Sequence, residues 1–182
     1  MRTPNKLIIF KKLIIISYEI NYDQKGQFLS MKKIFLILLS TVIIWANEYQ
    51  IGQSIKPVIL NDQFGTAHKI DKMPRTIIMT FEKEPSDILN KYLSKQSEGY
   101  LEKNNGVFIA DISGMPAFVS KTFALPKMKK YKYKVLLITD ENEGAKYPYQ
   151  EGQITIIKTE NDRIKSISFT DKLSQLNKMI EK

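Results

Sequence analysis

The sequence contains no cysteine and a single histidine, His68. Without cysteine the chain cannot form a disulfide, a thiolate nucleophile or a zinc–thiolate centre. One histidine also excludes a cluster of histidine ligands around a metal. The lack of cysteine leaves the cellular compartment open, because exported and cytosolic proteins can both lack it.

Several motifs with a known chemical mechanism are also missing. The sequence has no Gly-rich phosphate loop, no nucleophile elbow, no zinc-protease histidine pair and no calcium-binding loop. We therefore assign no catalytic residue and no metal ligand, and we expect no cofactor.

The composition is that of a globular protein, with 43% hydrophobic and 26% charged residues. The net charge of +9 is distributed unevenly, because basic residues are in clear excess over residues 1–46 while the remainder is only mildly basic. A mildly basic domain gives little reason to expect nucleic-acid binding. We expect no nucleic-acid partner, and a monomer.

A secretory signal is indicated at residues 31–46. Lys32 and Lys33 form a basic start, the apolar run Ile34–Trp45 follows, and Ala46 offers a small residue for cleavage before Asn47. As a helix this apolar run would span about 18 Å, which is short of the ~30 Å hydrocarbon core of a membrane. We expect a cleaved signal and a periplasmic protein; an uncleaved anchor and a buried core helix are the alternatives.

Residues 1–30 precede this segment and show no helical period long enough to predict an element. Our hypothesis is that Met31 is the true start and that residues 1–30 are translated upstream sequence or a disordered extension. An unusually long basic region before the apolar run is the alternative.

Residues 47–182 have the length of a single domain and alternate between strand and helix patterns. The first half predicts a hairpin, a doubly buried strand, a helix opening at Pro85–Asp87 that Ser86 or Glu84 caps, and another strand. The second half predicts a helix that Pro126 ends or kinks, a strand, a second hairpin and a final amphipathic helix. The predicted strands are Pro57–Leu60, Ala67–Ile70, Arg75–Phe81, Val107–Ile112, Val135–Thr139, Gln153–Lys158 and Arg163–Phe169.

This order predicts an α/β fold, a three-layer sandwich with a mixed sheet and helices on both faces. It resembles the thioredoxin-like superfamily, especially its exported thiol-disulfide oxidoreductase and peroxiredoxin branch. The segment Ile51–Ile70 resembles the opening of that branch, Arg75–Phe81 resembles the strand before its redox motif, and Gln153–Lys182 resembles its ending.

The resemblance implies positions for a redox centre that this chain does not have. The two cysteines would fall at Ser86 and Leu89, and the proline that usually precedes the last hairpin would fall near Gln153. Thiol–disulfide exchange needs a thiolate, so this chain cannot perform it or act as a thiol peroxidase. We expect a non-catalytic binding or accessory module, with a protein or peptide partner in a groove near residues 82–87 and Gln153.

The candidate binding residues near this groove are Glu84, Ser86, Asp87 and Gln153. Ser86 and the free amides of a helix start could hold an anion or the backbone of a partner. The alternative is that Ser86 and Asp87 only cap the helix. Neighbouring acidic pairs, such as Glu82 with Glu84, are interpreted as solubilising surface.

A second group of candidates lies in the string from Lys127 to Lys134. Its lysines alternate with Tyr131 and Tyr133 and could bind anionic lipid headgroups or an acidic partner. The alternative is a solvated helix end. The candidate residues are Lys127, Lys129, Lys130, Lys132 and Lys134.

His68 is the remaining candidate for chemistry. A cysteine-independent enzyme is favoured only if His68 meets a carboxylate in a pocket, and the sequence shows no such partner. A hydrogen-bonded, half-exposed role in the first hairpin is the alternative.

Overall fold

The computed structural model describes residues 48–70 and 72–181. The expected signal segment, its cleavage site at Ala46 and Asn47, and the proposed start at Met31 lie outside the described residues, so these stay predictions. Within the described residues, no helix combines the length and apolar character that crossing a membrane requires.

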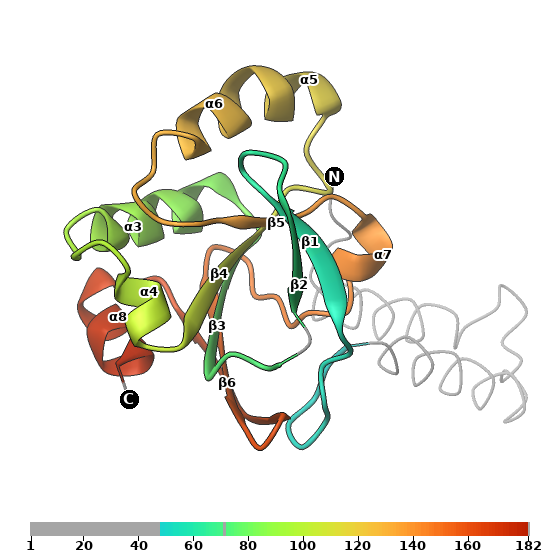
Figure 1. The fold of residues 1–182 in the computed structure, drawn as a ribbon, viewed down its shortest axis with the longest axis vertical. Helices are drawn as coiled ribbons and strands as arrows, with labels where there is room; N and C mark the ends of the chain where they lie inside the picture. The colour runs from blue at the N-terminus through green and yellow to red at the C-terminus, as the bar shows by residue number, and fades with distance from the viewer. Residues whose placement is uncertain (1–47, 71, 182) are drawn as a thin grey trace, which may run out of the picture. The chain divides into compact units, whose positions relative to one another are not determined.

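A seven-stranded mixed sheet organises the fold, in the order β2-β1-β5-β4-β3-β6-β7 (Figure 1). Strands β3, β4 and β5 are parallel, while β1, β2, β6 and β7 are paired antiparallel to their neighbours. The strands are β1 (Val58–Asp62), β2 (Ala67–Ile70), β3 (Thr76–Thr80), β4 (Gly106–Asp111), β5 (Leu136–Ile138), β6 (Ile154–Glu160) and β7 (Arg163–Thr170). The predicted succession of strands is confirmed.

Two apolar layers cover the faces of the sheet, and the alternation along β3 shows why. Ile78 points into one layer, while its neighbours Ile77 and Met79 point into the other. All five residues of β3 are buried, as a strand covered on both faces requires. This strand therefore contributes to both apolar layers.

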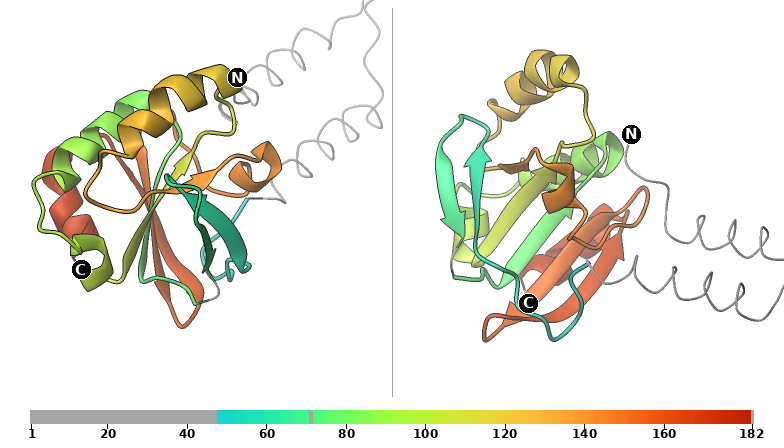
Figure 2. Two further views of the ribbon diagram at one scale, coloured as in Figure 1. Left: turned by 45° about the horizontal axis from the view of Figure 1, so that its top comes forward. Right: turned by 90° about the vertical axis from the view of Figure 1, so that its right-hand side faces the viewer.

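The two layers differ in their helices (Figure 2). One face packs against most of the helical residues, with Leu89, Met128 and Leu176 in its core. The other face is covered by the segment from Tyr49 to Ile55 and by the short helix α7 (Glu141–Gly144) (Figure 2). The helices are α3 (Lys83–Leu93), α4 (Tyr100–Lys103), α5 (Ala117–Val119), the π-helix η1 (Ser120–Ala124), α6 (Leu125–Met128), α7 (Glu141–Gly144) and α8 (Leu173–Ile180).

Helix α3 begins two residues before the predicted start at Pro85. Its N-cap is Glu82, and the side chain of Glu82 makes no capping hydrogen bond. The predictions of Ser86 or Glu84 as the cap are wrong, because both residues lie inside the helix. Pro85 is tolerated in the first turn, since N–H groups there have no partner within the helix.

Pro126 does not end the helix that contains it. Helices α5, η1 and α6 follow one another without a break, and the backbone widens to a π-helix over Ser120–Ala124 just before the proline. Proline donates no hydrogen bond and crowds the carbonyl of the preceding turn, so a wider turn at this point relieves the clash.

The last hairpin turns at Asn161 and Asp162, where φ is 50° and 58°. Two consecutive positive φ values are typical of a type I′ turn, which matches the twist of the flanking strands. The hairpin was predicted, but its strands end later than expected, at Glu160 and Thr170, and the first begins at Ile154 instead of Gln153.

Candidate functional site

The start of α3 is fastened to the loop before β6 through Glu82. Its Oε2 accepts a hydrogen bond of 2.8 Å from the Gly152 N–H, and its Oε1 accepts one from the Tyr149 hydroxyl. The Tyr149 ring also packs edge-on against Phe81, with ring centroids 5.3 Å apart. The interpretation of Glu82 as solubilising surface is therefore wrong: it holds two distant segments together.

The two positions where the resemblance places redox cysteines are structural. The Ser86 hydroxyl donates a hydrogen bond of 2.7 Å to Thr80 Oγ1 at the end of β3. The Leu89 side chain is fully buried in the core beneath α3. Ser86 ties the helix to the sheet, and Leu89 fills the space between them.

The two groups of candidate binding residues meet at one ion pair. Lys127 on α6 contacts the carboxylate of Asp87 on α3. This hydrogen bond raises the pKa of Lys127 above its ordinary value. Both side chains are about half exposed, at 50% and 44%, so solvent screens the pair strongly.

In the rest of the string from Lys127 to Lys134, the tyrosines are partly buried and the lysines are exposed. Tyr131 and Tyr133 stack on each other with ring centroids 5.1 Å apart, and the Tyr133 hydroxyl donates a hydrogen bond to Asn90 Oδ1 on α3. Burial raises the pKa of Tyr133. The tyrosines are thus partly buried against the core, whereas Lys129, Lys130, Lys132 and Lys134 are exposed.

His68 does meet a carboxylate. Its Nε2 lies 2.9 Å from Asp62 Oδ2, next to the turn of the first hairpin. The other oxygen of Asp62 accepts hydrogen bonds from the N–H groups of Phe64 and Thr66, each 2.9 Å long. Sequence reasoning missed this pair, although an aspartate that precedes a Gly-containing turn is a signal for such backbone bonds.

The environment of Asp62 acts on its pKa in two directions. Burial raises the pKa, while the hydrogen bond to His68 and those from the Thr66 and Phe64 backbone lower it. The lowering contributions win, and the pKa lies below its ordinary value of 3.8. Asp62 is therefore a stable carboxylate that anchors the hairpin turn and orients His68.

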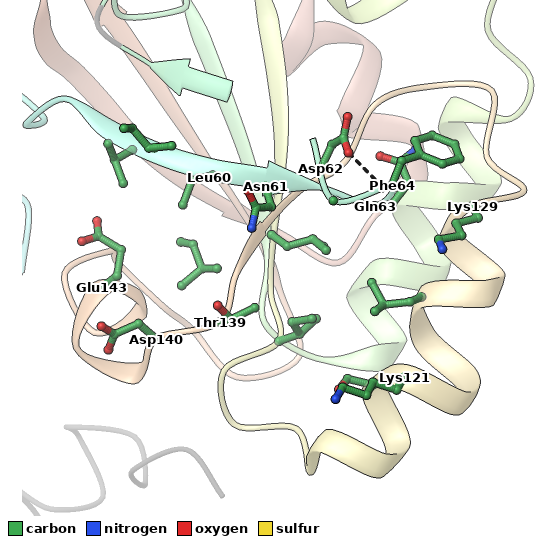
Figure 3. A pocket seen from close by; sticks show the side chains of 18 residues that line it. Leu60, Asn61, Asp62, Gln63, Phe64, Lys121, Lys129, Thr139, Asp140 and Glu143 are labelled. Carbon is green, nitrogen blue, oxygen red and sulfur yellow. Dashed lines mark hydrogen bonds between the residues drawn. The ribbon is translucent and has the colours of Figure 1, made fainter. Parts of the chain in front are cut away.

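A cleft of about 570 Å³ opens between β1 and the helices η1 and α6 (Figure 3). Figure 3 shows Lys121 and Lys129 on the helical side and Asp140 and Glu143 on the opposite side, with β1 running along a third side of the cleft. Asp62 borders the cleft. Sequence reasoning did not find this cleft, because its walls come from segments far apart in the chain.

The groove predicted beside α3 is shallower. A hollow of about 410 Å³ on the surface of α3 is bordered by Glu84 and Asp87, together with Lys83, Ile88 and Lys91. Gln153 is half-buried next to the Glu82 contact, and its N–H donates to the Gln150 carbonyl. Binding at Glu84, Ser86, Asp87 and Gln153 stays a prediction.

The part of the chain that the structure describes contains no candidate metal-binding site. Over residues 48–70 and 72–181, no group of three or more histidine, aspartate or glutamate side chains is placed to hold an ion.

Comparison with other proteins gives a fold. No protein-family model matches the sequence, and no curated protein does. Among solved structures, the peroxidoxin BcpB from Mycobacterium tuberculosis matches with a TM-score of 0.50 and 12% identity, over 73% of this chain and 95% of that one. The thioredoxin domain of a thiol-disulfide oxidoreductase from Bacteroides vulgatus matches with a TM-score of 0.46 and 14% identity, over 73% and 99%. The chain is a cysteine-free protein with a thioredoxin-like fold.

Proposed function

We propose that this chain is an exported, non-catalytic thioredoxin-like module that binds a protein or peptide partner. One observation carries the proposal: both positions that would hold the redox pair, Ser86 and Leu89, serve helix-to-sheet contacts. A protein that keeps the sheet but uses these two positions for packing has lost thiol chemistry. Its surface can still bind a partner. Export is supported by the sequence pattern of residues 31–46.

Exposed aromatic side chains support the binding role. Phe64, Phe118 and Phe123 have exposed fractions of 61%, 70% and 62%. Phe118 and Phe123 also form an edge-to-face pair with ring centroids 6.2 Å apart. Large aromatic side chains on the surface are typical anchors for a partner, because covering them removes much apolar area from water.

In-cell photo-crosslinking of the full chain in its native host tests the proposal. A photoreactive amino acid at Phe64 or Phe118 should yield a discrete crosslinked band in the periplasmic fraction, while the same probe at exposed Glu98 should not. The purified chain should show no turnover in thiol reductase and peroxidase assays. The proposal fails if neither aromatic position gives a discrete product, or if the chain stays in the cytoplasm.

A second candidate role is contact with an anionic membrane surface. It is favoured by the exposed Phe118 and Phe123 on the helix that leads into the exposed lysines 129, 130, 132 and 134. Aromatic insertion combined with lysine attraction is how peripheral segments bind headgroups. Binding to vesicles that contain phosphatidylglycerol should then weaken with salt. Binding indifferent to salt and lipid charge would eliminate this role.

A further inference from the structure

The cleft beside β1 arises because β1 and β5 separate after a short ladder. Their register consists of Asn61 opposite Leu137 and Asp62 opposite Leu136, although β5 continues to Ile138. On its other side, β1 stays paired with β2 back to Val58. The two strands therefore diverge, and the first half of β1 borders the cavity.

This divergence exposes one edge of β1. Residues 58–60 pair with β2 on one side, and the described residues place no strand on the side that faces the cleft. In an antiparallel ladder, backbone groups of alternate residues point to each side. The open side of β1 is thus a template on which an extended peptide can add as a strand.

The walls of the cleft suit aliphatic side chains. Leu60, Leu137 and Ile138 contribute from the sheet, and Leu125 contributes from α6. Ile59 lies at the rim with 66% of its surface exposed. Successive side chains of a strand point to opposite faces. An added strand would therefore bury every second side chain against these walls, and apolar side chains fit there best.

The charges at the two sides of the cleft differ in sign. Lys121 and Lys129 project from η1 and α6, while Asp140 and Glu143 lie at the start of α7 (Figure 3). Glu143 is paired with Lys146, so Asp140 carries more of the attraction for an added cation. One oxygen of Asp140 accepts from the Asn142 N–H.

We propose that this cleft binds an extended peptide segment of the partner as an added strand next to β1. The peptide has an aliphatic centre, an acidic residue that faces Lys121 and Lys129, and a basic residue that faces Asp140. The inference rests on the proposed function, because it identifies the site and the chemistry of the partner of that binding module.

The test uses the full chain and a short fluorescent peptide with alternating valine and threonine, a glutamate near one end and a lysine near the other. Fluorescence anisotropy should show saturable binding. Lys129→Glu should weaken it about fivefold, the size expected when a partly exposed charge pair is lost. Lys132→Glu, which changes an exposed lysine that does not line the cleft, is the matched control and should leave the affinity unchanged.

Two further probes and one further variant test strand addition and the charge contacts separately. A probe whose glutamate is replaced by lysine should bind the Lys129→Glu variant better than it binds the parent. A probe with alternate N-methylated amides should lose binding to the parent, because it cannot form the ladder with β1. Asp140→Asn, which keeps the acceptor for Asn142, should weaken the original probe as Lys129→Glu does.

The inference is overturned if the probe does not bind, if Lys129→Glu and Lys132→Glu act alike, or if the methylated probe binds as well as its parent. Circular dichroism of each variant confirms that the fold is intact. The proposed function fails separately, through the crosslinking experiment at Phe64 and Phe118. Crosslinks with an unresponsive probe would leave a binding module whose site lies elsewhere.

Discussion

Glu82 and Gly152 are joined by a hydrogen bond of 2.8 Å that connects the start of α3 to the loop before β6. The same carboxylate also receives the hydroxyl of Tyr149. In a thioredoxin-like fold without cysteine, this contact holds together the two segments that the resemblance associates with the redox site. The contact therefore has a structural role in the region where the resemblance would place redox chemistry.

Glu82→Ala should lower the free energy of unfolding by about 1–3 kcal/mol, because it removes an ionised acceptor and leaves two donors without it. Urea denaturation followed by circular dichroism measures the change. Glu84→Ala, in the same helical turn but exposed, is the matched control and should stay within about 0.5 kcal/mol of the parent. Equal effects of the two substitutions would contradict the role of Glu82.

Gly144→Ala should destabilise the protein by about 1–3 kcal/mol through overpacking. A Cβ atom at this position would lie 2.2 Å from Asp111 Oδ2, which is too close for any van der Waals contact. Thermal unfolding measures the effect. Combination with Asp111→Ala, which removes the clashing carboxylate, should cost less than the sum of the single changes. Strict additivity would show that the clash is relieved in another way.

The lowered pKa of Asp62 predicts a loss of stability in acid. Because the native pKa lies below the ordinary value of 3.8, the folded state favours the carboxylate. The resulting stabilisation is fully present above that ordinary value and disappears as the pH falls through the native pKa. Asp62→Asn should flatten this part of the profile when unfolding is measured at a series of acidic pH values. An unchanged slope would assign the acid sensitivity to other groups.

Leu89→Cys should give a thiol that a water-soluble reagent cannot modify in the native protein, because the parent side chain is fully buried. Modification should begin only with global unfolding in denaturant. Glu98→Cys, at an exposed position, is the control and should react at once. Rapid native-state labelling of Leu89→Cys would mean that α3 opens locally.

The double variant Ser86→Cys with Leu89→Cys should not acquire disulfide reductase activity. A reactive pair needs an accessible thiolate, and Leu89 faces the core instead of solvent. An insulin-reduction assay gives the readout. Turnover above that of the parent would show that the scaffold still presents these two positions as a redox pair.

The local sequence was enough to predict most of the strands and their order. The run Arg75–Phe81 is apolar and β-branched, which predicts a doubly buried strand, and β3 is that strand. Asn161 and Asp162 favour a tight turn, and the last hairpin turns there. These features depend on neighbours within a few residues, so the local sequence pattern is enough to predict them. Composition alone likewise excludes thiol chemistry, because the chain has no cysteine to supply a thiolate.

The tertiary structure decided what the polar side chains do. Glu82 reaches Tyr149 and Gly152, and Asp87 meets Lys127, only after the chain has folded. The cleft beside β1 exists because β1 pairs with β5 only at Asn61 and Asp62 and diverges from it before Asn61, which no local pattern encodes. Which partner a polar side chain meets depends on the distances that packing sets between remote segments. The hydrophobic periodicity of the sequence does not determine these distances.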